Sequence, residues 1–126
     1  DKYGHQEGDK LLKELAKVIL DNIRKEVDSA YRYGGDEFAV ILPHASRQQA
    51  LMVAQRLLSS FRKKSMSSTG LSIGLAKLEG SGETLKENLE SLIRNADQAA
   101  YRAKINGGNQ VCDDQGQRAF PKPSLV

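Results

Sequence analysis

The sequence has no tryptophan, a single cysteine and two histidines among its 126 residues. One cysteine cannot form an internal disulfide, and Cys112 with both histidines supplies too few ligands for a usual zinc site. We therefore expect a protein of a reducing compartment whose stability comes from its hydrophobic core. The longest purely apolar run, residues 38–42, is far too short to span a membrane, and no secretory leader opens the chain. The chain is accordingly predicted to be soluble and to make no membrane contact itself.

Charge of one sign is not concentrated in any segment. The formal net charge is +3 and the pI is about 9.0, but lysine and arginine are spread along the predicted helices rather than grouped into a basic arm. This distribution argues against nucleic acid as a partner and is compatible with phosphate ligands. With 39% hydrophobic and 28% charged residues, the chain has the composition and length of one globular domain.

Hydrophobic periodicity predicts an α+β fold with helices flanking a mostly antiparallel sheet. Residues 1–9 are expected to form a loop, and a helix follows Gly8. Two runs at residues 29–33 and 37–42 flank a glycine pair and predict a hairpin. A second helix is predicted to begin at the capping pair Ser46 and Gln49, and a strand follows at 71–76. A third helix is predicted to begin at the pair Thr84 and Glu87 and to be broken at most once before Gly107. A short strand is expected after Asn109, followed by a loose end.

The tip of the predicted hairpin carries the pattern with chemical meaning. Gly34 and Gly35 leave no side chain in the way of a ligand and permit positive φ, so backbone N–H groups can approach a phosphate. Asp36 and Glu37 follow. Because adjacent residues of a strand point to opposite faces, we expect one of the two acids to be the main ligand, unless the turn bends both side chains to the same side. Carboxylate oxygen beside such a backbone suits Mg²⁺. The alternative is an ordinary turn with solvated acids.

Four motifs in order show a resemblance to a known family. The segment Arg32-Tyr33-Gly34-Gly35-Asp36-Glu37-Phe38 resembles the signature of the GGDEF family, the diguanylate cyclases. The other three motifs resemble the family's Gly-His and Gly-Asp loop, its Ser-Ile-Gly strand and its closing Ala-Asp and Tyr-x-Ala-Lys helix; they are residues 1–9, 71–74 and 96–104. The chain is thus identified as a single GGDEF domain over residues 1–126, with residues 113–126 as a C-terminal tail.

The resemblance implies a palm-like nucleotide cyclase fold and a specific reaction. Family members condense two GTP molecules into cyclic di-GMP and release pyrophosphate, using Mg²⁺ or Mn²⁺. Each domain holds one GTP, so a homodimer is needed for catalysis. The resemblance further implies a cytoplasmic domain, also where the whole protein is membrane-anchored, and an upstream sensory or receiver domain that controls it in bacterial second-messenger signalling.

The resemblance also assigns roles to single residues. Asp9 should accept hydrogen bonds from the guanine edge and Leu12 should pack against the base, although a helix N-cap and a core residue are the alternatives for these positions. The remaining assigned positions contact phosphate or metal: Gly34 and Gly35 border the phosphates, Asp36 and Glu37 act at the metal and the attacking hydroxyl, and Lys104 reaches the triphosphate, with a solvated lysine as the alternative. His5 is expected to shape its loop without binding a ligand.

Three departures from the family pattern leave alternatives open. The first family strand, with a further metal-binding Asp, precedes the motifs in relatives and is absent here. Gly108 stands where the family has a basic residue. Lys25 and Asp28 occupy the register of the family's product-inhibition site, where Arg is usual, so product inhibition should be weak. The leading interpretation is an active diguanylate cyclase; the alternatives are a catalytically weak GGDEF domain that binds GTP and regulates a partner domain, and a cyclase that makes a monocyclic product.

Overall fold

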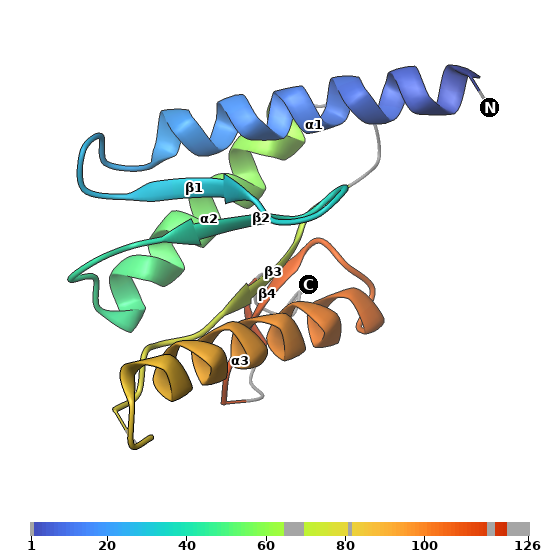
Figure 1. Cartoon of the computed structure of the whole chain (residues 1–126). Helices are drawn as coiled ribbons and strands as arrows, with labels where there is room; N and C mark the ends of the chain where they lie inside the picture. The colour runs from blue at the N-terminus through green and yellow to red at the C-terminus, as the bar shows by residue number, and fades with distance from the viewer. Residues whose placement is uncertain (1, 65–69, 81, 116–117, 121–126) are drawn as a thin grey trace, which may run out of the picture.

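A computed structural model describes residues 2–64, 70–80, 82–115 and 118–120 of the chain. These residues form three helices and five short strands (Figure 1). In chain order the elements are α1 (Lys2–Asn22), β1 (Ser29–Arg32), β2 (Phe38–Ile41), α2 (Arg47–Lys64), β3 (Ser72–Leu75), α3 (Leu85–Ile105), β4 (Gln110–Asp113) and β5 (Arg118–Phe120). No helix in these ranges combines the length and apolarity needed to cross a bilayer.

The strands form two separate hydrogen-bonded sheets within the described residues. β1 and β2 make an antiparallel hairpin that places Arg32 opposite Phe38, and a second sheet has the order β3-β4-β5. The α+β class is therefore confirmed. Two of the three strand pairs are antiparallel, as expected; the third, β3 with β4, is parallel because α3 crosses between them and returns the chain in the same direction. β5, which the sequence did not predict, pairs antiparallel with β4.

The core lies between the helices and the sheets. Val18 and Ile19 of α1 pack with Leu57 and Phe61 of α2, and side chains of the hairpin and of β3 close this cluster. Successive side chains of β4 point to opposite faces of the sheet, and the two faces pack against different helices. Val111 packs with α2, whereas Cys112 packs with Ala99 and Ala103 of α3; these side chains are buried. In Figure 1, α1 and α3 lie on opposite sides of the strands.

The first helix begins much earlier than the sequence predicted. Residues 1–9 were expected to form a loop, but α1 starts at Lys2 and is continuous to Asn22 through Gly4 and Gly8. A glycine inside a helix costs only about 1 kcal/mol relative to alanine, and the good helix formers Gln6 and Glu7 lie between the two. Placement of the His5 side chain lies outside the described residues, so its expected role stays a prediction.

The predicted starts of α2 and α3 are confirmed. The N–H of Gln49 donates to Ser46 Oγ at 3.1 Å, and the Gln49 side chain accepts from the Ser46 N–H at 2.8 Å, which completes a capping box. Thr84 Oγ1 likewise accepts from the N–H of Glu87 at 3.1 Å. α3 runs without a break to Ile105, and Gly107 and Gly108 then close it with positive φ angles of 113° and 73°.

Candidate functional site

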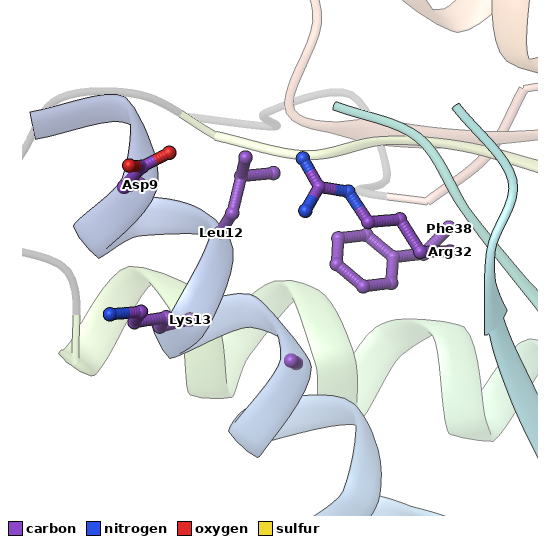
Figure 2. Close-up of a pocket in the computed structure, with 6 residues that line it drawn as sticks. Asp9, Leu12, Lys13, Arg32 and Phe38 are labelled. Carbon is purple, nitrogen blue, oxygen red and sulfur yellow. The ribbon is translucent and has the colours of Figure 1, made fainter. Parts of the chain in front are cut away.

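A pocket of about 200 Å³ opens between α1 and the hairpin. Its lining residues come from both elements and are Asp9, Leu12, Lys13, Ala16, Arg32 and Phe38. Figure 2 shows the side chains of Leu12 and Arg32 pointing toward one another, one from the helix and one from the hairpin. Small-molecule sites usually measure about 300–1,000 Å³, so the pocket as it stands fits part of a nucleotide.

Asp9 and Leu12 therefore lie together where the sequence suggested a base-binding pair. Asp9 is exposed and lies in the interior of α1, so the N-cap alternative is wrong: a cap residue precedes the first helical turn. Leu12 is half-buried at the pocket, while its helix neighbours Leu11 and Leu15 pack against the core. The carboxylate and the apolar side chain are thus both available to a ligand that enters between α1 and the hairpin.

The glycine pair forms an open turn at the hairpin tip. The N–H groups of Tyr33 and Gly34 donate to the carbonyl of Glu37, at 2.8 and 3.2 Å. Neither Gly34 nor Gly35 has positive φ, so this turn does not use the left-handed conformation that glycine permits. A Cβ atom built at Gly35 would meet no atom of the described part of the chain within 4 Å. Glycine is therefore not required here by the packing of the chain itself, and the space beside it is open to a ligand.

Asp36 and Glu37 are both exposed on this turn. Both lie between the strands, since β1 ends at Arg32 and β2 starts at Phe38, so the alternation of faces along a strand does not separate them. The described residues contain no group of three acidic, histidine or cysteine side chains that could hold a metal by itself. Mg²⁺ in nucleotide enzymes is usually held by one or two carboxylates together with substrate phosphates, and this pair fits such a site.

Lys104 lies exposed in the last turn of α3, just before the Gly107–Gly108 turn. The end of α3 and the tip of the hairpin point to the same side of the molecule in Figure 1. The N–H of Gly108 donates to the carbonyl of Ala103 at 2.9 Å, and that of Gly107 to Lys104 at 3.3 Å. Gly108, at the position where a basic residue was expected, thus serves to end the helix.

Comparison with known proteins identifies the domain that carries this pocket and turn. The family model described as "Diguanylate cyclase, GGDEF domain" matches residues 1–110. The chain belongs to the GGDEF domain family. This GGDEF chain also resembles a solved X-ray structure of an EAL/GGDEF domain protein from M. capsulatus, with a TM-score of 0.67 and 31% identity over 86% of this chain and 71% of that chain.

Curated relatives of the GGDEF chain include named diguanylate cyclases. Diguanylate cyclase A of Treponema denticola is 39% identical over 88% of this chain and 30% of its own length. Diguanylate cyclase DosC of Escherichia coli K12 is 36% identical, with coverages of 88% and 24%. Response regulator PleD of Caulobacter vibrioides is 34% identical, with coverages of 88% and 25%. The chain thus spans between 24% and 30% of the length of these relatives.

At the position where a product-inhibition site was predicted, the structure has an internal ion pair between Arg24 and Asp28. The side chain of Asp28 is only 1% exposed and accepts from the Arg24 guanidinium at 2.7 Å, and also from the Arg24 N–H at 2.7 Å. The same guanidinium donates to the carbonyl of Pro43 at 2.9 Å. Lys25 is exposed. Through Arg24, Asp28 therefore holds the segment after α1 against the segment after β2. Little of the hydrogen-bonding capacity of its carboxylate remains for a ligand.

This ion pair makes stability depend on pH. The hydrogen bonds from the Arg24 side chain hold the pKa of the Asp28 carboxyl below its ordinary value, against the opposing effect of burial. The stabilisation of the folded state by this ion pair is complete well above pH 4, which is near the ordinary pKa of Asp. It is lost as the pH falls through the lower pKa that Asp28 has in the folded protein.

We expect Asp28→Asn to cost about 1 kcal/mol at pH 7, since Arg24 is half exposed. Urea unfolding at pH 7 and at pH 3 measures this, and the difference from wild type should shrink at pH 3. Asp21→Asn is the control, because the pair of Asp21 with Lys64, among the described residues, is exposed on the surface and 3.5 Å long. A cost for Asp28→Asn that does not change with pH would contradict the assignment.

Sequence reasoning assigned no role to four residues that line the pocket. Phe38 and Ala16 look like core residues by periodicity, and Lys13 like a solvated helix residue. Arg32 stands inside the quoted signature but was given no function. Its side chain lines the pocket and also donates a hydrogen bond to the Gly35 carbonyl of the turn. The only signal in the sequence was its position two residues before Gly34.

Proposed function

We propose that this GGDEF domain is the catalytic domain of a diguanylate cyclase, which condenses two GTP molecules into cyclic di-GMP and releases two pyrophosphates. The observation that carries the proposal is the pocket with Asp9 and Leu12 beside the open turn of Gly34, Gly35 and Asp36. A base site next to a backbone that a phosphate can approach is the arrangement that a nucleoside triphosphate needs.

Each residue has a role that its position supports. Asp9 accepts from guanine N1–H and N2–H₂, and Leu12 packs against the base. The turn at Gly34 and Gly35 borders the phosphates, and Lys104 compensates charge on the leaving pyrophosphate. The 3′-hydroxyl of each GTP attacks the α-phosphate of the other, so two domains must face one another in a homodimer.

Asp36 and Glu37 would hold Mg²⁺ or Mn²⁺ together with the substrate phosphates. When bound, such an ion neutralises phosphate charge and makes the attacking hydroxyl easier to deprotonate. Glu37 also accepts turn hydrogen bonds through its carbonyl, which fixes the backbone from which both carboxylates extend. Holding the reacting groups in place is the main contribution of the protein.

A second function is favoured by Gly108. Its missing side chain removes the expected basic contact to phosphate, so the domain would bind GTP and regulate a partner domain with little turnover. Both functions fit a cytoplasmic domain controlled by an upstream sensory or receiver domain. The relative named as a response regulator, and the short span of the curated relatives that this chain covers, support such an architecture.

The test is incubation of the protein with GTP and Mg²⁺, followed by separation of the products by anion-exchange chromatography. We expect cyclic di-GMP and twice as much pyrophosphate. Bound GTP without product would favour the regulatory function, and a monocyclic guanosine phosphate would indicate the third possibility, a different nucleotide cyclase.

Asp9→Ala should weaken GTP binding about tenfold or more and leave ATP binding nearly unchanged, because adenine presents no comparable pair of donors to a carboxylate. Since Asp9 lies inside α1, alanine should not destabilise the fold. Calorimetric titration of both nucleotides into wild type, Asp9→Ala and the surface control Asp21→Ala measures the effect. Equal losses for GTP and ATP would contradict recognition of guanine by Asp9.

A further inference from the structure

Arg32 connects the pocket with the glycine turn. Its guanidinium lines the pocket and donates to both glycine carbonyls: Nε lies 3.3 Å from Gly34 O and 3.2 Å from Gly35 O, and Nη2 lies 2.5 Å from Gly35 O. It extends from the last residue of β1, whose register partner on β2 is Phe38. One side chain, fixed to a paired strand, therefore holds both peptide groups of the turn from the pocket side.

The orientation of these peptide groups decides what the turn presents on its other side. In a trans peptide, the C=O of one residue and the N–H of the next point in opposite directions. Because the Gly34 and Gly35 carbonyls point to Arg32, the N–H groups of Gly35 and Asp36 point away from it. No hydrogen bond within the described residues uses these two N–H groups. Two successive free N–H groups form a concavity that binds anions.

We propose that Arg32 is a positioning residue for the triphosphate of GTP, because it fixes the turn so that the N–H groups of Gly35 and Asp36 face the phosphates. This inference rests on the proposed function. A Cβ atom built at Gly35 would meet no atom of the described residues within 4 Å, and without the clamp a glycine pair samples many orientations that phosphate binding must then order. Lysine cannot replace the guanidinium, since a single ammonium lacks the planar fork that reaches two carbonyls.

The experiment compares a ligand with phosphates to one without. Calorimetry measures the binding of 3′-deoxy-GTP, which lacks the attacking hydroxyl and cannot turn over, and of guanosine. We expect Arg32→Lys and Arg32→Gln each to weaken 3′-deoxy-GTP binding about tenfold and to weaken guanosine binding much less, although Arg32 also lines the pocket. Arg94→Gln is the matched control, because Arg94 lies exposed on α3 and, among the described residues, its side chain donates to Ser91 alone, at 3.1 Å. It should bind both ligands like wild type.

A second measurement does not depend on affinity. Inorganic triphosphate added to ¹⁵N-labelled wild type should shift the amide signals of Gly35 and Asp36, and these shifts should shrink in Arg32→Lys. Full retention of 3′-deoxy-GTP binding by Arg32→Lys would overturn the inference, since charge alone would then suffice. An equal loss of affinity for guanosine would also overturn the inference, because Arg32 would then act through the base pocket or the fold.

The inference and the proposed function can fail separately. A wild-type protein that makes no cyclic di-GMP but loses 3′-deoxy-GTP affinity in both Arg32 variants would support the clamp and contradict the cyclase. A wild-type protein that makes cyclic di-GMP but binds 3′-deoxy-GTP no better than guanosine would support the cyclase and contradict the clamp.

Discussion

Replacing Asp36 with asparagine should abolish cyclic di-GMP synthesis while leaving the fold intact. The substitution keeps the size of the side chain and removes the charge that a divalent cation and the phosphates share. Loss of one carboxylate from such a site costs about 3 kcal/mol or more of transition-state stabilisation, which lowers turnover at least about 100-fold. Asp36 is exposed, and its carboxylate makes no hydrogen bond or ion pair with the described part of the chain, so unfolding should change by less than about 0.5 kcal/mol.

The measurement is turnover of GTP at saturating Mg²⁺, together with urea unfolding of the same preparations. Asp21→Asn is the matched control, since it removes the same charge from an exposed helix position outside the site. Wild-type turnover in Asp36→Asn would refute its metal role. Partial recovery at high Mn²⁺ would support it, because a weakened metal site is refilled by a more strongly bound ion.

The features that sequence reasoning predicted well are encoded over a few residues. The capping box of Ser46 and Gln49 and the cap of Thr84 depend on residues three apart, and the structure forms both as predicted. The hairpin follows from two short strand-forming runs around a glycine pair. Such signals need no knowledge of the rest of the fold, so they can be read from the chain directly.

The features that were missed depend on contacts between distant segments or on the path of a flexible side chain. The parallel pairing of β3 with β4 requires the whole crossover helix. The start of α1 at Lys2 overrides two glycines whose individual cost is small. Arg32 folds back onto the turn that follows it, and Arg24 takes the carboxylate of Asp28; neither choice of partner is encoded in spacing alone.

Gly74 links a family motif to a packing requirement. A glycine inside a strand is typical of a bulge or of a close backbone approach, and Gly74 of β3 makes a close approach. A Cβ atom built there would lie 2.1 Å from the Ala96 carbonyl oxygen and 2.4 Å from the Ala100 nitrogen, both of α3. β3 and α3 therefore touch through backbone at this point, and Ala99 and Ala103 of α3 are fully buried close by.

Gly74→Ala should consequently destabilise the protein by about 3 kcal/mol or more, because the clashing atoms are helix backbone and cannot rotate away. For a domain whose total stability is about 5–15 kcal/mol, this is a large fraction, and expression as a folded protein could be lost.

Urea unfolding measures the effect. Gly80→Ala is the control, since a Cβ there meets nothing within 4 Å and stability should hardly change. Adding Ala100→Gly to Gly74→Ala should not restore stability, because it leaves the Ala96 oxygen and the residue 100 nitrogen in place. A rescue by that double variant, or a cost for Gly74→Ala no larger than that of Gly80→Ala, would show that α3 can move away from β3 and that the glycine serves another purpose.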